Sequence, residues 1–349
     1  MSFCAFIGKQ APSILARLVL ALALQPVWSA TFTLPADGST VVGQIRKVEA
    51  THQNTLLDIG RHFDLGYAEM EGANPGMSVW TPHGDVVVPT QFILPPKPWS
   101  GIVVNIPQRR LFFFPKARHG QPAQVITYPI SIAQPGWSTP LGTSKIIAKF
   151  KDPAWFVPKS IQAQHAREDG TPFPDYFPPG PDNPMGMLAM QTGLPGIYIH
   201  GTNHPWGVGL RTSHGCMHLY PEDAAQLFPL VSRGTPVTIL NQPVVTGHLA
   251  DEWMIAIFPP VAEYPDQPPL NDLVASALSN LPLPPPQIAM TRVAARLRQP
   301  GPIAVPLDIN QPEPETTLED ITVEAYPFQP YDTNANTAQA PAGSPPATP

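Results

Sequence analysis

One cysteine of this chain lies in a short stretch crowded with histidine and glycine. Residues 198–224 read YIHGTNHPWGVGLRTSHGCMHLYPEDA, with Cys216 directly after Gly215. A thiol attacks carbonyl carbon as the thiolate, and a free cysteine has a pKa of about 8.5, so a neighbouring base must raise its reactive fraction. His200 ends the short apolar segment 196–200, and the end of a strand would hold a base firmly in place. The pattern therefore predicts acyl transfer with Cys216 as nucleophile and His200 as base.

The residues around this pair could support the same chemistry. Gly215 lets a substrate approach the backbone closely, and amide groups that precede a helix favour a thiolate and can hold an oxyanion. A third group should fix the imidazole tautomer, but no Asp or Asn stands at an obvious spacing, so we expect a backbone carbonyl such as that of Gly201 to do this.

A metal site is the other interpretation of this stretch. Zinc sites usually draw on paired ligands at set spacings, whereas a single cysteine with scattered histidines is a weak zinc pattern. We therefore predict neither a metal nor a cofactor. The residues that such a site would use are His200, His204, His214, Cys216 and His218.

The order HGT, glycine-rich spacer, SHGC resembles the signature of L,D-transpeptidase catalytic domains of the YkuD type. The segments STPLG (138–142) and GPDNPMG (180–186) are also similar to segments of that family, and the resemblance covers about residues 100–241. It implies that Cys216 is the nucleophile and His200 the acid and base. It further implies a supporting or oxyanion-forming role for His214, Ser213, Gly215 and Gly201, and substrate binding by Arg211 and His218.

One position departs from the family pattern. The family usually has arginine two residues after the cysteine, and this chain has His218 there. An arginine is always charged, whereas a histidine is only partly charged near neutral pH. We therefore expect activity to depend more strongly on pH than in relatives that carry the arginine.

The resemblance also implies a reaction. The thiolate attacks the carbonyl of the L-centred residue of a peptidoglycan tetrapeptide stem, D-alanine leaves, and an amine accepts the acyl group. The acceptor stays open: it could be another stem, the lysine of an outer-membrane lipoprotein, a free D-amino acid, or water, which would make the protein a hydrolase. A catalytically weak peptidoglycan-binding protein is the further alternative, since His218 replaces the usual arginine.

The first 30 residues have the layout of a secretory signal peptide. No Asp or Glu occurs before Asp37, Lys9 and Arg17 precede the apolar run 18–24, and small residues follow it. That run is shorter than the ~20 residues that span a bilayer. Cleavage after Ala30 would place Trp28 two residues before Ala30, where a small residue is preferred. Cleavage after Ser29 is therefore equally compatible with the pattern. We expect a periplasmic protein.

Removal of this segment would also remove Cys4. The mature chain would then keep Cys216 as its only thiol, in a compartment where cysteines usually pair. An unpaired cysteine in an exported protein indicates a reactive thiol.

The rest of the sequence predicts compact domains joined by proline-rich chain. The 349 residues include 49 prolines, and a net charge of −6 without basic runs argues against a nucleic-acid partner. The fold class we expect is mostly β: a β-rich catalytic domain at 99–241, a mixed β-sandwich with a short helix. A small βααβ unit at 41–96 precedes it and resembles a LysM domain, which implies binding to peptidoglycan glycan. We expect a proline-rich loop at 152–184 that acts as a lid, a C-terminal extension at 242–298, and a disordered tail at 299–349.

Overall fold

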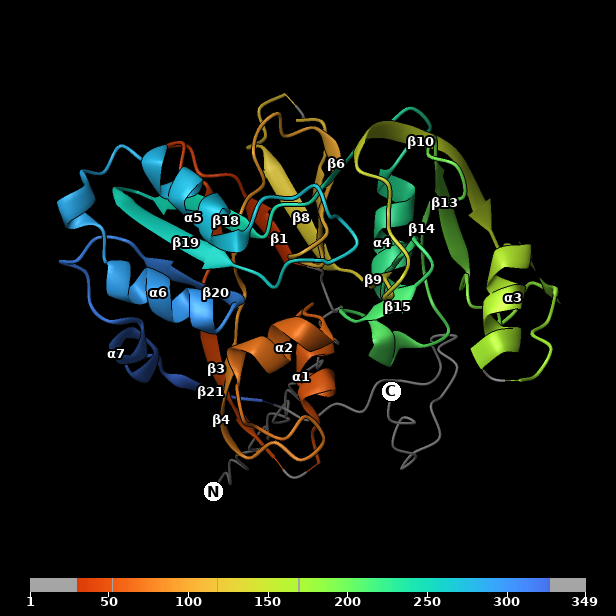
Figure 1. Ribbon diagram of the computed structural model, residues 1–349, viewed down its shortest axis with the longest axis horizontal. Helices are drawn as coiled ribbons and strands as arrows, with labels where there is room; N and C mark the ends of the chain where they lie inside the picture. Colours follow the sequence, from red (N-terminus) through yellow and green to blue (C-terminus); the bar gives the residue numbers. More distant parts are fainter. Residues whose placement is uncertain (1–29, 52, 118, 169, 327–349) are drawn as a thin grey trace, which may run out of the picture.

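The computed structural model describes residues 30–51, 53–117, 119–168 and 170–326, and its centre is a curled nine-stranded sheet (Figure 1). The expected signal peptide lies outside the described residues except for Ala30. The β-rich expectation is confirmed. The strands of the sheet are, in spatial order, β1 (Ala30–Thr33), β8 (Gln124–Pro129), β7 (Arg110–Phe114), β6 (Gly101–Asn105), β17 (Pro236–Leu240), β10 (Gly142–Lys151), β13 (Leu188–Thr192), β14 (Tyr198–His200) and β16 (Met217–His218).

The long strand β10 joins the two halves of this sheet. Its first residues pair with β17, the residues from Ile146 onward pair with β13, and the register shifts between Ile146 and Ala148. A bulge of this kind bends a strand and lets it pass from one layer to the next. The apolar core of the predicted catalytic domain, called the catalytic core below, therefore lies between the halves, and α4 (Pro221–Leu230) packs against β13.

Residues 101–114 of the nine-stranded sheet form a hairpin. β6 and β7 pair antiparallel, with Gly101 opposite Phe114. Their uninterrupted apolar runs are buried on both faces, as such runs require. Ile102 faces the catalytic core, while Val103 and Phe112 face a second core that belongs mainly to the N-terminal unit.

The N-terminal unit has the βααβ order that the sequence predicts. β3 (Arg46–Ala50) pairs antiparallel with β4 (Gly84–Val88), and α1 (Leu56–His62) and α2 (Tyr67–Ala73) lie between them in the chain. A smaller pair, β2 (Val41–Gly43) and β5 (Gln91–Ile93), flanks them. The assignment of this unit to the LysM type stays a prediction.

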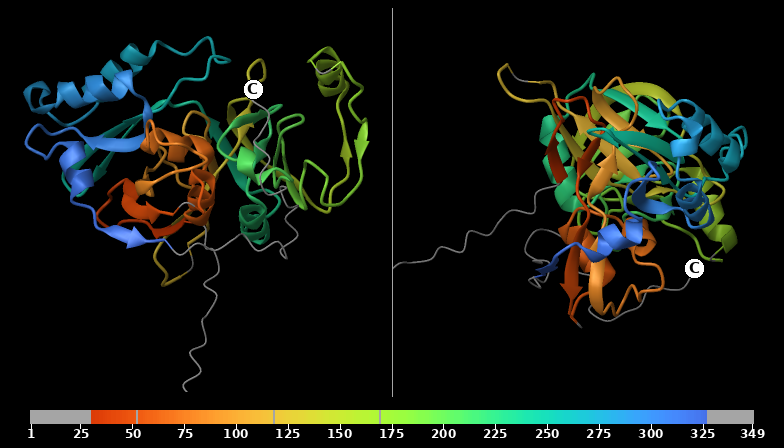
Figure 2. Two further views of the ribbon diagram at one scale, coloured as in Figure 1. Left: turned by 90° about the horizontal axis from the view of Figure 1, so that it is seen from below. Right: turned by 90° about the vertical axis from the view of Figure 1, so that its left-hand side faces the viewer.

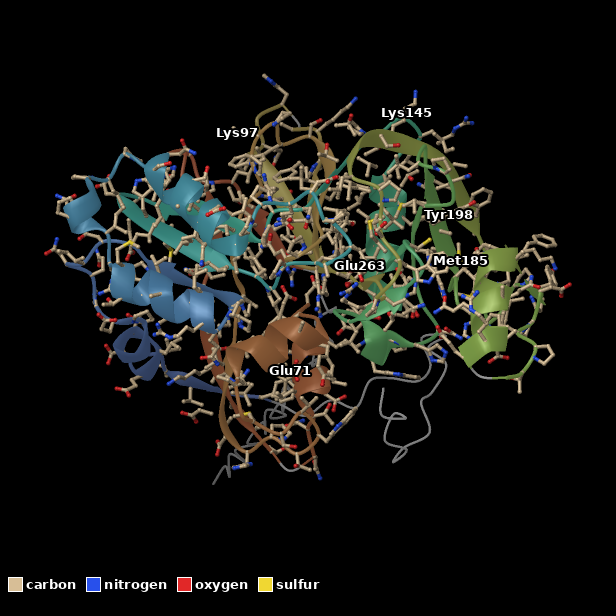
Figure 3. All side chains as sticks on the ribbon, viewed as in Figure 1. Glu71, Lys97, Lys145, Met185, Tyr198 and Glu263 are labelled. Carbon is tan, nitrogen blue, oxygen red and sulfur yellow. The ribbon has the colours of Figure 1, made fainter. Side chains whose placement is uncertain are left out.

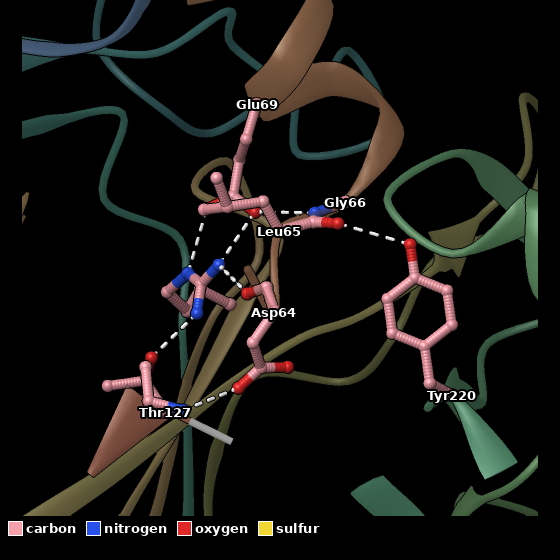
Figure 4. Close-up of polar contacts among 8 residues, drawn as sticks. Asp64, Leu65, Gly66, Glu69, Thr127 and Tyr220 are labelled. Carbon is pink, nitrogen blue, oxygen red and sulfur yellow. Dashed lines mark hydrogen bonds and ion pairs between the residues drawn. The ribbon is translucent and has the colours of Figure 1, made fainter. Parts of the chain in front are cut away.

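A buried arginine joins the N-terminal unit to the catalytic sheet. The guanidinium of Arg110, on β7, donates from Nε and Nη2 to the two carboxylate oxygens of Glu69 on α2, at 2.7 Å each (Figure 4). It also donates to Thr127 Oγ1 at 2.6 Å and to the Asp64 carbonyl at 2.9 Å. Because all these atoms are out of water, the two units are held in one orientation by charge as well as by packing.

The segment 152–184 is more ordered than the loop we expected. It contains α3 (Lys159–Glu168) and the small antiparallel pair β11 (Trp155–Phe156) and β12 (Tyr176–Phe177), and it stands away from the main body (Figure 2). The expectation of a plain loop was wrong because residues 159–168 contain no proline and bury Ile161 and Gln164 on one face. Whether the segment acts as a lid stays a prediction.

The C-terminal part is a three-stranded antiparallel sheet covered by helices. β18 (Val244–Leu249), β19 (Glu252–Ile257) and β20 (Gly301–Pro306) pack on α5 (Leu270–Ser279) and α6 (Met290–Arg298). After α7 (Pro314–Glu319), β21 (Val323–Ala325) pairs parallel to β3. None of the helices in the described ranges combines the length and apolar character needed to cross a membrane.

The expectation of a disordered tail from residue 299 was therefore wrong for residues 301–325. Val305 and Leu307 are buried in the C-terminal core, although the composition around them is rich in proline. Residues 327–349 lie outside the described part of the chain.

Candidate active site

Cys216 and His200 lie at two neighbouring strands of the sheet. β14 and β16 pair in parallel, with Ile199 opposite Met217 and His200 opposite His218, around the labelled Tyr198 in Figure 3. Continued by one residue, this register places Cys216 beside Tyr198. Because side chains alternate along a strand, Cys216, His218 and His200 share one face. The two residues that the sequence singles out thus lie on one face of two neighbouring strands, although fifteen others separate them in the chain.

The ring of His200 is buried and held by a backbone carbonyl. Its Nδ1 lies 2.6 Å from the carbonyl oxygen of Gly201, as the sequence led us to expect. A carbonyl only accepts, so Nδ1 carries the hydrogen and Nε2 keeps its lone pair. Burial lowers the pKa of His200 to about 4, against a smaller opposing effect of the Gly201 and Met185 carbonyls. At neutral pH the ring is an uncharged base.

Cys216 is a thiol in the resting protein. The side chain is partly exposed, and its Sγ lies 3.6 Å from the carbonyl oxygen of Gly196. Burial of the sulfur raises the pKa of Cys216 to about 11, and the backbone N–H of Tyr198 opposes this shift. The pair therefore rests as thiol and neutral imidazole, which suits proton transfer during attack better than a preformed ion pair.

Ser213 and Gly215 shape the turn that presents the cysteine. The Ser213 hydroxyl donates to the Cys216 carbonyl at 2.6 Å and accepts from the Gly215 amide at 3.2 Å. Gly215 has a φ of +120°, and a Cβ there would lie 3.2 Å from the carbonyl oxygen of Ser138. Thr139 donates to the Gly215 carbonyl at 2.8 Å. The role of Thr139 was not predicted, although the segment STPLG that contains it was noted.

His214 connects the turn to the projecting segment. Its Nε2 lies 3.0 Å from Gln164 Oε1 on α3 and 3.1 Å from Gln134 Nε2. Trp137 donates to the same Gln164 oxygen at 2.8 Å and packs edge-on against the His214 ring. Sequence reasoning missed both glutamines, because neither lies in a motif and their meeting depends on where α3 folds back.

The structure gives Arg211 a protein partner. β15 (Arg211–Ser213) pairs parallel with β9 (Ile132–Ala133), and the Arg211 Nη2 donates to Glu263 Oε2 at 2.6 Å. Its Nε donates to the Ala133 carbonyl at 3.0 Å. Guanidinium has five N–H donors, so these contacts leave capacity for a substrate.

His218 packs against the catalytic histidine, with ring centroids 4.6 Å apart. Burial lowers the pKa of His218 well below its usual range, and the neighbouring His200, His214 and His204 lower it further. The expected partial charge near neutral pH is therefore wrong: the ring is uncharged there. Among the residues that the structure describes, no group of three or more His, Cys, Asp or Glu side chains could hold a metal ion.

Comparison with known proteins agrees with the signature. The family model described as the L,D-transpeptidase catalytic domain, YkuD, matches residues 100–239. The probable L,D-transpeptidase YbiS of Escherichia coli K12 is 40% identical over 220 residues, which cover 61% of this chain and 70% of that protein. The probable L,D-transpeptidase ErfK/SrfK of the same strain is 36% identical over 238 residues, covering 66% and 74%. A solved L,D-transpeptidase from Mycobacterium smegmatis is 25% identical with a TM-score of 0.29, covering 43% of this chain and 61% of that one.

Proposed function

The chain belongs to the L,D-transpeptidase family of cysteine-dependent peptidoglycan enzymes, and from this we propose that it forms an acyl-enzyme at Cys216 with tetrapeptide stems and passes the acyl group to an amine. The observation that carries the proposal is the pairing of β14 with β16, which sets Cys216 on the same face as His200. Since Gly201 fixes the His200 tautomer, the free Nε2 is the atom that takes the thiol proton.

The reaction runs in two balanced steps. In the first, His200 removes the Sγ proton, sulfur bonds to the carbonyl carbon of the L-centred residue, and the C–N bond to D-alanine breaks as the imidazolium returns the proton to the leaving amine. In the second, an acceptor amine attacks the thioester, gives its proton to His200, and displaces Cys216, which regains a proton.

The remaining site residues have proposed roles around this pair. Backbone amides of the turn 214–216 hold the developing oxyanion, with Ser213 keeping the turn closed. Arg211 binds an anionic group of the stem through its remaining donors, and His218 contributes a neutral hydrogen bond or packing surface.

We further propose that the acceptor is either a second stem, giving 3-3 cross-links, or the lysine of an outer-membrane lipoprotein. The N-terminal unit would bind the glycan as LysM domains do, and the protein would work in the periplasm after signal removal. These assignments rest on the family and on the sequence layout.

The test uses the purified mature protein with disaccharide-tetrapeptide fragments and a lysine derivative as acceptor. Mass spectrometry should show a thioester adduct on Cys216 and a new amide product with loss of D-alanine. Cys216→Ala and His200→Gln should abolish both, whereas the matched histidine change His204→Gln should preserve them. A product formed only with water would identify a hydrolase, and absence of any adduct would leave a binding protein and refute the proposal.

A further inference from the structure

Most of the charges buried between the N-terminal unit and the catalytic domain are paired. Arg110 with Glu69 forms one ion pair, with side chains 0% and 7% exposed. Arg61 on α1 and Glu222 on α4 form a second, with Nε 2.6 Å from Oε1. Each pair sums to zero charge, so neither arginine is left over to balance a further carboxylate.

Two further carboxyl groups lie in the same interface. Asp64 follows α1, Asp223 lies on α4, and both side chains are almost fully buried. The two carboxyl groups lie close enough to each other for each to influence the pKa of the other. Burial raises the pKa of Asp64 to about 7 and that of Asp223 well above its usual range. Neither of these carboxyl groups is the partner of Arg61 or Arg110 in the two ion pairs, and a buried carboxylate without a counter-charge is costly.

One nitrogen is held against this carboxylate. The backbone N of Ala30 donates to Asp64 Oδ2 at 2.7 Å (Figure 4). Ala30 is the first residue of β1, and β1 pairs with β8 so that Ala30 lies opposite Thr127. Strand pairing therefore fixes this nitrogen at the carboxylate. The same residue lies at one of the two cut sites that the signal-peptide pattern leaves open.

We propose that the signal peptide is removed between Ser29 and Ala30, and that the new ammonium group of Ala30 forms a buried ion pair with Asp64 that fastens the N-terminal unit to the catalytic domain. Hydrolysis of the Ser29–Ala30 amide by a signal peptidase consumes one water, leaves a carboxylate on Ser29 and an amine on Ala30, and the amine takes up one proton. A cut after Ala30 would instead remove the nitrogen that contacts Asp64.

Processing would then add one positive charge to this interface, next to the Asp64 carboxyl group. In the uncleaved chain, the group that Ala30 presents to Asp64 is a neutral amide N–H. In the processed chain the same position carries a cation, and charge-assisted hydrogen bonds are roughly twice as strong as neutral ones. Docking of the two units is therefore completed by maturation, independently of the reaction at Cys216.

The first test identifies the mature end. Full-length protein is exported, recovered from the periplasm, and measured by intact mass and N-terminal sequencing. The expected end is Ala30. An end at Thr31, or a chain that keeps residues before Ala30, overturns the proposal.

The second test measures the ion pair with three otherwise identical chains: one that begins with free Ala30, one that begins with Ser29, and one with N-acetylated Ala30. At pH 7 the free-Ala30 chain should have the highest Tm. The advantage should disappear above the pKa of the amine, because a cation stabilised by folding contributes only while it is protonated. Equal Tm values for the three chains at pH 7 overturn the proposal.

Asp64→Asn gives the matching control. It should remove the Tm difference between the free and the acetylated chain. Acylation of the Ala30 amine at pH 7 should also become about tenfold faster in this variant. The reason is that loss of the carboxylate lowers the pKa of the amine, and one pKa unit changes its unprotonated fraction about tenfold. If Asp64→Asn does not fold, the acylation rate of the free-Ala30 chain is compared with that of a short peptide starting ATFT, and equal rates overturn the proposal.

Discussion

In the protein without substrate, the rate at which Cys216 reacts with a disulfide should increase with pH. The environment of the thiol raises its pKa from 9.0 to about 11. At pH 8 this lowers the thiolate fraction about 100-fold relative to an unperturbed cysteine, from roughly one-tenth to roughly one-thousandth. A more basic thiolate is also a better nucleophile. With a Brønsted slope of about 0.4–0.5, an increase of two pKa units raises the rate constant of the thiolate by a factor of roughly 6 to 10. The net expectation is a rate about 10 to 15 times below that of a free cysteine.

The assay is thiol–disulfide exchange with an aromatic disulfide, followed by the absorbance of the released thiolate. The mature chain suits it, because removal of the signal peptide leaves Cys216 as the only cysteine. The rate should rise about tenfold per pH unit and keep rising beyond pH 10.

A variant separates reactivity from catalysis. His200→Gln should leave this pH profile within about threefold, because the ring is already neutral above its pKa of about 4. It should nevertheless abolish acyl transfer, since the proton acceptor is gone. His204→Gln serves as control and should change neither. A wild-type rate that levels off below pH 9 would show a thiolate paired with imidazolium, and the general-base assignment would be refuted.

Three further outcomes are expected. Glu69→Gln should lower the free energy of unfolding in urea by about 3–5 kcal/mol, because it leaves the fully buried guanidinium of Arg110 without its counter-charge. As a control, Glu71→Gln at an exposed position should change the free energy of unfolding by less than about 0.5 kcal/mol. His218→Arg places a permanent cation beside His200, which should lower the pKa values of His200 and Cys216 and so move both limbs of the kcat/KM–pH profile to lower pH. Superimposable profiles would show that a charge at position 218 does not affect the catalytic pair. Ser213→Ala removes the bond that closes the cysteine turn, and we expect kcat to fall about 10-fold or more with KM little changed, measured as D-alanine release.

Local sequence was enough to predict which residues carry the chemistry. The short motifs name Cys216 and His200, and the apolar runs of β6 and β7 have the strand-forming residues that their burial requires. The carbonyl of Gly201 could be anticipated as well, because no acidic partner stands nearby in the sequence. The segment 159–168 was misread because the surrounding prolines suggested a loop, although a proline-free run of ten residues is long enough for a helix.

Contacts between distant segments could not be anticipated in this way. Gln164 reaches His214, and Glu263 reaches Arg211, only because separate elements fold against the active-site turn. Each of these side chains is an ordinary polar residue in its own segment. The sequence around a polar residue does not indicate which distant residue will be its hydrogen-bond or ion-pair partner.

The sequence by itself was enough to propose the reactive residues and to determine the βααβ order of the first unit and the predominance of strands, since these depend on residue types and on periodicities within a few residues. Only the tertiary structure decided the place of β17 between β6 and β10, the burial of Arg110, and the meeting of Asp64 with Ala30 and Asp223. The physical reason is that burial and the pairing of distant groups depend on the free energy of the whole folded chain. The local sequence around a charged residue beside a turn is therefore the same whether that residue lies in water or in the core.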